Sequence, residues 1–441
     1  MQEYFYQLAD RLTALLQGKE IYTCTFDAEE SDFVRFNRSA VRQAGTVTQR
    51  SLSVNLIDGQ RHTHGGISLS GDWEEDHAHL ATLVTNLRAQ LPYLPDDPHL
   101  LYATEVHSSE HAGENRLPED TNAVIASILD AGRGRDLVGI YAAGGIHDGF
   151  ANSFGQRNWF SSYSYNFDWS FYHQGDKAVK CAYAGLVWNP SEFAHKVATA
   201  TEQLAVLAQP PRTIAPGRYR VYLAPAALAD IVGLLSWGGF GLKDHRTKQT
   251  VLLKMAEEGA RLHPAVTIQE NIADGVGANF QEAGFIKPDC VTLIANGAFR
   301  DCLVSPRSAK EYGVPTNGAS GGEMPDALDV AGGSLPESEV LRQLDTGIYI
   351  NNVWYLNYSD RTACRMTGMT RFATLWVENG VIQAPLNVMR FDETLYRMLG
   401  ENLVGLTAER ELILDSSTYG GRSTASSRMP GAVVKDFTFT L

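Results

Sequence analysis

The stretch Asn351–Phe391 constrains the fold more than any other part of the chain, because its pattern is that of strands joined by a tight turn. Apolar and polar side chains alternate up to Trp354, which is typical of a strand with one buried face. A second apolar run ends near Asn379 and Gly380, which tolerate the positive φ angles of a two-residue hairpin turn. We therefore expect a strand, a polar loop over 357–370, a second strand, the tight turn and a third strand.

The polar loop of this segment carries more charge than a plain connection needs. It contains Asp360, Arg361 and Arg365, and Arg371 follows it directly. One interpretation is a solvated hairpin tip in which the arginines form structural ion pairs, for instance with Asp360. The other is a surface that contacts a ligand, because binding residues are often carried on loops held by a rigid scaffold. The sequence leaves both interpretations open.

Length, charge and cysteine content exclude several classes of protein. A chain of 441 residues is too long for one core, so we expect two or three domains. The formal net charge of −14 argues against binding to nucleic acid, which requires a basic surface. The five cysteines show no paired spacing and the first residues do not form a signal peptide, so we expect reduced thiols in a cytoplasmic protein. The apolar run Val221–Leu242 predicts a buried strand and helix, because its glycine, alanine and proline content does not suit a membrane span.

The order of the predicted elements indicates an α+β fold. A helix with one apolar face, several alternating strands and a second helix form a first α+β domain over residues 1–93. Residues 94–207 form a central α+β segment that packs with the first. Its strand Tyr163–Phe171 alternates between aromatic and polar side chains, as in an antiparallel strand with one buried face. The proline-rich stretch 208–217 is the predicted linker, and residues 218–441 are expected to form a β-rich, barrel-like domain.

Two short motifs carry catalytic chemistry in other contexts. His107, Glu110 and His111 match the H-x-x-E-H pattern, in which a helix places both imidazoles on one face for zinc and the glutamate acts as a general base. Here the segment is bounded by proline-rich sequence and has no helical period. A solvated loop is therefore the favoured interpretation, and a self-sufficient zinc peptidase is the alternative.

The second motif, Gly318–Gly322, matches the G-x-S-x-G nucleophile elbow around Ser320. No histidine follows Ser320 in the sequence, and Pro325 prevents a helix from starting where the elbow requires one. We expect a glycine loop instead of a serine nucleophile. Such a loop, with Asn317 at its start, is a candidate for closing over a bound chain.

Several segments, taken in order, resemble the TldD/PmbA family. They are Phe33–Ser39, Arg50–Val54, Cys302–Ala309, Tyr358–Arg361 and Thr367–Arg371, and the resemblance extends over essentially the whole length. The family was first named for modulation of DNA gyrase and is regarded as a cytosolic metallopeptidase system. The resemblance implies a heterodimer of a zinc-bearing TldD subunit and a metal-free TldE (PmbA) subunit, which degrades unfolded chains and trims precursor peptides inside an enclosed cavity.

The position of the zinc motif distinguishes the two subunits. The TldD subunit carries H-E-x-x-x-H on a helix after a strand like 218–224. In this chain Ser236 and Gly241 stand where the histidines would be, and Trp237 stands where the glutamate would be. None of the three can bind zinc or act as a base at neutral pH. The chain therefore resembles the TldE-type subunit, and we expect no cofactor in it and zinc in a TldD-like partner.

The leading hypothesis is a metal-free partner subunit that completes the chamber and helps to bind extended peptides by strand addition, a mode that does not read substrate sequence. A non-enzymatic peptide-binding homodimer is a further alternative. Neither nucleic acid nor a membrane is an expected partner. The candidate substrate contacts are Asn317, Gly318, Ser320, Asp360, Arg361, Arg365 and Arg371.

Overall fold

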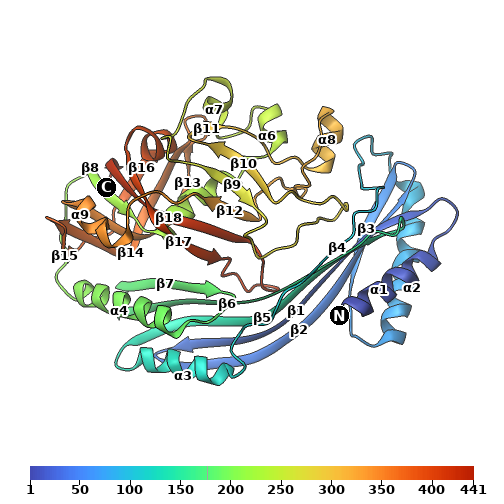
Figure 1. The fold of residues 1–441 in the computed structure, drawn as a ribbon, viewed down its shortest axis with the longest axis horizontal. Coiled ribbons are helices and arrows are strands. Elements are labelled where there is room, and N and C mark those ends of the chain that lie inside the picture. Colours follow the sequence, from blue (N-terminus) through green and yellow to red (C-terminus); the bar gives the residue numbers. More distant parts are fainter. Residues whose placement is uncertain (176) are drawn as a thin grey trace.

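The computed structural model describes residues 1–175 and 177–441 and has the mixed α+β fold expected from the sequence (Figure 1). The described residues form two sheets, one of seven and one of eleven strands, that lie against each other. None of the helices in these residues is long and apolar enough to cross a membrane.

The elements of the N-terminal half are α1 (Gln2–Leu15), β1 (Ile21–Asn37), β2 (Ala40–Asp58), β3 (Arg61–Ser68), α2 (Trp73–Gln90), β4 (Ser109–Ala112), α3 (Thr121–Gly132), β5 (Asp136–Asn152), β6 (Arg157–Gln174), β7 (Lys177–Gly185) and α4 (Pro190–Leu207). The elements of the C-terminal half are β8 (Gly217–Leu223), α5 (Pro225–Gly233), α6 (Leu242–Arg246), α7 (Leu253–Glu257), β9 (Ile268–Asn271), β10 (Cys290–Ala295), β11 (Ala298–Phe299), α8 (Pro306–Tyr312), β12 (Ala327–Val330), α9 (Val340–Leu344), β13 (Gly347–Asp360), β14 (Arg365–Glu378), β15 (Val381–Pro385), β16 (Arg390–Thr394), β17 (Leu403–Leu414) and β18 (Ser426–Phe439).

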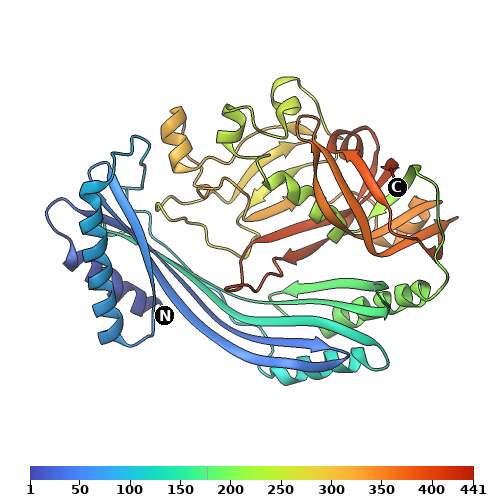
Figure 2. The same ribbon diagram turned by 180° about the vertical axis from the view of Figure 1, so that it is seen from behind.

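The first sheet is built from long antiparallel strands. Its order is β3–β2–β1–β5–β6–β4, and β7 pairs with a different stretch of β6 from the one that pairs with β4. At one end α1 and α2 bury Phe5, Phe26 and Trp159, and at the other end α3 and α4 pack around Phe167 and Trp169. Strands of this length twist and bend, and the C-terminal half lies in the concave side of the bend (Figure 2).

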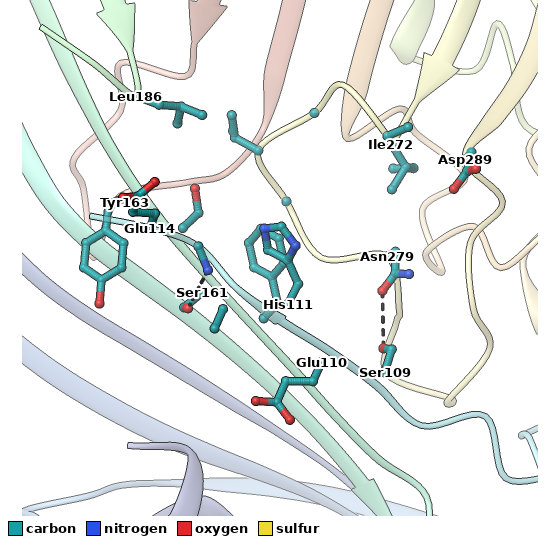
Figure 3. Close-up of a pocket in the computed structure, with 18 of the residues that line it drawn as sticks. Ser109, Glu110, His111, Glu114, Ser161, Tyr163, Leu186, Ile272, Asn279 and Asp289 are labelled. Carbon is teal, nitrogen blue, oxygen red and sulfur yellow. Dashed lines mark hydrogen bonds between the residues drawn. The ribbon is translucent and has the colours of Figure 1, made fainter. Parts of the chain in front are cut away.

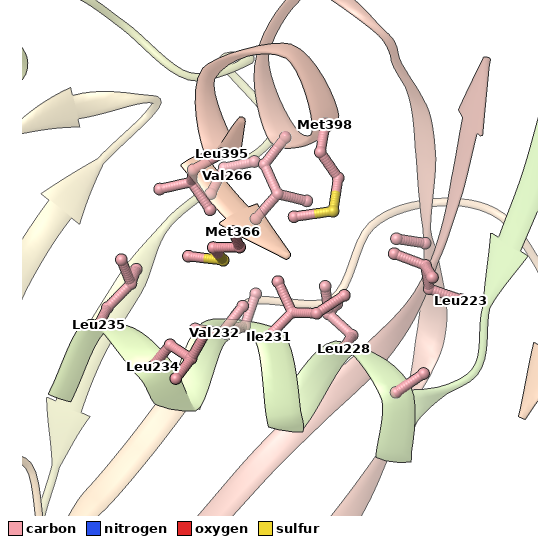
Figure 4. Close-up of a cluster of buried hydrophobic side chains, with 14 of the residues drawn as sticks. Leu223, Leu228, Ile231, Val232, Leu234, Leu235, Val266, Met366, Leu395 and Met398 are labelled. Atoms are coloured by element: carbon pink, nitrogen blue, oxygen red, sulfur yellow. The ribbon is translucent and has the colours of Figure 1, made fainter. Parts of the chain in front are cut away.

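The second sheet contains a closed ring of strands. The neighbours β8, β13, β14, β16 and β18 follow one another, and an additional pairing of β18 with β8 completes the circle. The helix α5 follows β8 directly and packs Leu228, Ile231 and Val232 against a cluster that includes Met366 and Met398 (Figure 4). All five side chains are buried. The ring confirms the barrel-like C-terminal half.

The polar face of β6 corrects one prediction. The aromatic face of Tyr163–Phe171 is largely buried as expected, but Ser164 is only 4% exposed and Asn166 only 8% exposed. The Asn166 side chain donates a hydrogen bond to the carbonyl of Asp415 in the C-terminal half, at 3.3 Å. The interpretation of one buried face is therefore wrong, because a part of the chain far away in sequence covers the other face.

The hairpin predicted around Asn379 and Gly380 is confirmed, and both residues have positive φ angles, of 51° and 74°. The polar loop predicted over 357–370 is wrong. β13 continues to Asp360 and β14 begins at Arg365, so only four residues remain for the turn. The composition of this stretch resembles that of a loop. The pairing of β13 with β14 nevertheless continues through it, because register shifts accommodate the extra residues.

The two N-terminal segments expected at 1–93 and 94–207 contribute to one sheet, since β5 pairs with β1 along most of its length. The stretch 208–217 runs from α4 to β8. It is held to the C-terminal half by Arg212, whose guanidinium lies 4.5 Å from the centre of the Trp376 ring. The 208–217 connection therefore packs against the C-terminal half.

Candidate functional site

A cleft lies between the concave face of the first sheet and two connections of the C-terminal half, residues 272–289 and 415–425. It contains three cavities of about 500, 290 and 600 Å³. The second and third share Asp27, Asp148 and Thr424 in their linings and are therefore contiguous. Cavities of this size between two structural units are the usual location of binding sites.

The floor of the cleft is a row of side chains that crosses four strands. Asp27 on β1 lies opposite Asp148 on β5, Asp148 lies opposite Phe160 on β6, and Phe160 lies opposite His111 on β4. The His111 imidazole stacks on the Phe160 ring with 5.2 Å between the centres (Figure 3). Phe280, from the 272–289 connection, packs on Phe160 and supports that connection on the floor. Register alone therefore brings two carboxylates, an aromatic ring and an imidazole into line.

The strand β4 has a free edge beside the 500 Å³ cavity. It pairs only with β6 among the described strands, and its residues line the 500 Å³ cavity. The N–H of Gly113 donates to the Ser161 carbonyl on β6 at 2.9 Å. Because backbone groups alternate in direction along a strand, the N–H and C=O groups of Glu110 and Ala112 point away from β6, at the edge beside this cavity. An extended chain in this cavity would meet unpaired backbone groups.

The two facing carboxylates have perturbed ionisation. Burial, and the negative charge of Asp27 next to it, raise the pKa of Asp148 to about 7, although Lys287 opposes the shift. Burial also raises the pKa of Asp27. The Asp27 side chain is accessible to solvent within the cavity but is surrounded by protein on most sides, so its charge is poorly hydrated. Lys287 forms its ion pair with Asp326 instead of with either of these carboxylates.

Arg422 fixes the 415–425 connection to the first sheet. Its guanidinium donates to the Ser164 carbonyl at 2.8 Å, to the Ser164 hydroxyl at 2.7 Å and to the Gly144 carbonyl at 3.2 Å. A fourth bond reaches the Ser31 hydroxyl at 3.2 Å, and the backbone N–H of Arg422 donates to the Glu29 carboxylate at 3.1 Å. Burial lowers the pKa of the guanidinium, although Glu29 opposes this shift. These charge-assisted hydrogen bonds hold the 415–425 connection against the first sheet.

The H-x-x-E-H motif lies in the wall of this cleft but not on a helix. His107 precedes β4, and Glu110 and His111 belong to it, so the solvated loop expected here is replaced by a short strand. Residues four apart on an extended strand are about 13 Å apart. His111 points into the cavity and Glu110 points to the other side of the strand (Figure 3). This geometry does not bring the two histidines and the glutamate together around one metal ion.

The glycine loop after Asn317 is tied to its surroundings. The Asn317 amide accepts from the Val304 N–H and donates to the Cys302 carbonyl, both at 2.8 Å. Gly318 has a φ of 73°, and a Cβ atom there would lie 2.9 Å from the Ile286 carbonyl, so the residue is constrained to glycine. Asn317 reaches a minor cavity beside the cleft. Ser320 is not part of the lining of the three cavities of the cleft.

The charged residues of the β13–β14 hairpin are not among the lining residues of these cavities. Arg361 donates to the carbonyls of Trp237 and Gln249 at 3.3 and 3.4 Å, and Arg365 forms an ion pair with Asp392 at 3.1 Å.

The other two charged residues of the hairpin also have intramolecular contacts. The Asp360 carboxylate caps the turn by accepting from the Ala363 N–H at 3.1 Å. The Arg371 guanidinium lies 4.1 Å from the centre of the Trp354 ring. The ion pair considered between these arginines and Asp360 does not form, but the contacts of all four residues hold the hairpin in place.

The segment where the resemblance implies the zinc motif follows α5. Ser236 ends a single 3-10 turn, Trp237 is 57% exposed, and Gly241 precedes α6. The Ser236 hydroxyl and the Trp237 indole are not zinc ligands, and Gly241 has no side chain, so these residues do not form a zinc site. Within residues 1–175 and 177–441, no group of three or more His, Cys, Asp or Glu side chains is arranged to hold a metal ion.

Nothing in the sequence marks Asp27, Asp148 or Arg422 as members of one site. They lie in three different elements, and neither a motif nor a regular spacing links them. Asp27 itself is one of several acidic residues in β1, so it does not stand out in the sequence. Recognition of the site requires the register between β1 and β5.

Comparisons with known proteins agree with this architecture. Residues 216–441, more than half of the chain, match the PmbA/TldA metallopeptidase C-terminal domain. The chain therefore belongs to the PmbA/TldD metallopeptidase family. No curated protein matches the sequence.

Solved structures share the fold over the whole chain. TldE from Thermococcus kodakarensis is 11% identical with a TM-score of 0.80, and the match covers 99% of this chain and all of that one. A Thermotoga maritima protein described as a modulator of a DNA gyrase is 15% identical with a TM-score of 0.77 and the same coverage. A Bacteroides thetaiotaomicron protein described in similar words is 16% identical with a TM-score of 0.72 over 99% of this chain and 98% of that one. At these identities the likeness concerns the fold.

We predict that Arg422→Ala destabilises the protein by about 2–4 kcal/mol, because it removes charge-assisted hydrogen bonds and leaves buried carbonyls without a donor. Denaturant unfolding measures the change. Arg133→Ala is the matched control, since Arg133 is 83% exposed and pairs only with Asp130. We expect the control to change stability by less than about 0.5 kcal/mol. Equal effects of the two substitutions would show that Arg422 does not hold the halves together.

We also predict a pH-dependent effect of Asp148→Asn. The folded protein holds a proton on Asp148 up to about pH 7, whereas the unfolded chain releases it near pH 4, so this carboxyl lowers stability progressively as the pH rises between these values. The asparagine variant should therefore gain stability relative to the wild type across that range, by at most roughly 4 kcal/mol. Asp58→Asn, at the exposed end of β2, is the control. Parallel pH profiles for wild type and Asp148→Asn would contradict the burial of this charge.

Proposed function

We propose that this protein is the metal-free, TldE-type partner subunit of a TldD/TldE metallopeptidase and that its cleft holds unfolded or precursor peptides in extended form. The observation that carries the proposal is the free edge of β4 in the wall of the 500 Å³ cavity. The likeness to TldE over the full length of both chains supports the assignment to this subunit type.

The residues present do not fit a zinc ion at the position of the family motif. Ser236, Trp237 and Gly241 offer no imidazole, thiolate or carboxylate there. The nearest imidazole, that of His245, hydrogen-bonds through Nε2 to the Gly239 carbonyl at 2.8 Å and stacks on Phe299. In this proposal peptide-bond hydrolysis therefore takes place on a zinc-bearing TldD-like partner, and no hydrolytic step is assigned to this chain.

The contribution of this chain is to bind and orient the substrate. A peptide laid along β4 would pair its backbone with the outward N–H and C=O groups of Glu110 and Ala112. These bonds do not depend on side chains, which suits a system that acts on many unfolded sequences. The stacked rings of His111 and Phe160 supply an apolar surface for alternate side chains of the peptide.

The hairpin residues have a supporting role in this proposal. Arg361 holds the Trp237 loop, and Arg365 is paired with Asp392. Asn317 and Gly318 fix the course of the glycine loop beside the cleft. The side chain of Ser320 is partly exposed to solvent. In this proposal these residues hold the structure around the cleft and do not bind the peptide backbone.

Mixing the purified protein with a TldD-like zinc-bearing paralogue from the same organism tests the proposal. A reduced, carboxymethylated protein serves as the unfolded substrate. We expect cleavage in the mixture only, and we expect phenanthroline to abolish it by removing zinc from the partner. Cleavage by this chain alone, lost in His107→Ala, would establish the self-sufficient zinc peptidase instead. If the protein binds peptides but mixing adds no cleavage, the result would favour the non-enzymatic peptide-binding homodimer.

Strand addition makes a separate prediction about the peptide. A strand presents every second residue to its neighbour, so methylation of alternate backbone nitrogens leaves one edge able to pair. Methylation of consecutive nitrogens removes donors from both edges. We therefore expect alternate methylation to be tolerated and consecutive methylation to weaken binding by about tenfold or more in calorimetric titrations. Equal affinities for the two methylated peptides would exclude pairing with β4.

A further inference from the structure

The 290 Å³ cavity beside the strand edge combines free acceptors with an unpaired donor. Its floor carries Asp27 and Asp148, and its wall is formed by the 272–289 connection and by Asp326. Neither floor carboxylate has a hydrogen-bond or salt-bridge partner among the described residues. The positive charge in the wall, that of Lys287, is already paired with Asp326. The floor therefore offers two adjacent carboxylates without a cation of their own.

The unpaired donor is the side-chain amide of Gln281 in the wall of the same cavity. This residue is only 6% exposed. Its Oε1 accepts from the Ala283 N–H, but its Nε2 has no hydrogen-bond partner within the described parts of the chain. A buried N–H group without an acceptor costs about 1–3 kcal/mol. The cost is recovered when a ligand brings an oxygen to this position.

We propose that this cavity binds the free N-terminal residue of a peptide, with the α-ammonium group on Asp27 and Asp148 and the first carbonyl oxygen on Gln281. The inference rests on the proposed function, because the cavity adjoins the cleft assigned to the extended chain. An N-terminal residue is the part of a peptide that carries a cationic nitrogen and a carbonyl oxygen three bonds apart. A lysine side chain would supply the cation but would leave Gln281 unpaired.

A metal ion fits this cavity less well than an ammonium group. The described residues provide no set of three metal-ligating side chains here. An ammonium group donates three hydrogen bonds, and two facing carboxylates accept them without a fixed coordination geometry. The surrounding charge also favours a cation, since Asp326 and Glu282 lie in the wall and Lys287 is the positive side chain there.

The charge of the floor changes near neutral pH. The Asp148 carboxylate is faced by Asp27, Lys287 and Asp326 in this cavity. In the contiguous 600 Å³ cavity the charged side chains are those of Glu29, Arg50 and Arg422. Because the pKa of Asp148 is raised to about 7, the floor gains negative charge as the pH rises through that value. A peptide α-amino group loses its proton above about pH 8. Affinity for a free N-terminus should therefore be highest between these two values.

Calorimetric titration of the full chain with three probes tests the inference. The probes are a hexapeptide amide of glycine and serine, its N-acetylated form, and the acetylated form with one internal lysine. At about pH 7.5 we expect the free peptide to bind about tenfold or more tightly than either acetylated peptide, which is the value of one charge-assisted hydrogen bond. Asp148→Asn and Gln281→Leu should each reduce this ratio, and Asp58→Asn should leave it unchanged.

Each alternative result has a definite meaning. Equal binding of free and acetylated peptides would overturn the N-terminal subsite and leave the proposed peptide cleft intact. Binding of the acetylated lysine peptide as tightly as the free peptide would show that the carboxylates select a cationic side chain instead. Failure of all three peptides to bind, alone and in the mixture with the TldD-like subunit, would overturn both this subsite and the proposed function. The comparison of the three peptides on the wild-type protein does not depend on the folding of any variant.

Discussion

The arrangement of the two halves depends on the insertion of Arg422 into the concave face of the first sheet. Its guanidinium supplies donors to the Ser164 and Gly144 carbonyls in a region from which the second half excludes water. Without a donor from outside the sheet, these buried acceptors would be costly. The same side chain fixes the 415–425 connection next to the carboxylates of Asp27 and Asp148. This long-range contact thus helps to hold the halves together, beside the hydrophobic cluster that joins Leu375 to Phe167, and it borders the cleft.

The ring of the C-terminal half gives this contact a rigid base. The strand β18 belongs to the ring and follows directly after the connection that carries Arg422. The helix α5 fills one side of the ring with Leu228 and Ile231, and the segment after it is held by the β13–β14 hairpin through Arg361. The segment after α5 is therefore a structural joint between that helix and the hairpin.

Local patterns predicted those parts of the fold that depend on neighbouring residues. The Asn379–Gly380 turn follows from φ preferences, and the aromatic face of β6 follows from period-two alternation. The polar face of β6 and the short strand β4 were not predictable in the same way, because each is stabilised by residues distant in sequence. The site was less predictable still. Asp27 and Asp148 are 121 positions apart, and only the β1–β5 register brings them together.

The recessed position of β4 also affects how the protein meets other proteins. An exposed strand edge invites pairing with the edges of other folded chains and leads to self-association. Here the edge lies under the 272–289 connection, beside a cavity of about 500 Å³. A single extended chain fits such a space, whereas the edge strand of a folded sheet would have to bring its neighbouring strands and side chains with it. If the peptide-binding role proposed for this edge holds, the adjoining connection would favour single extended chains over the edges of folded sheets.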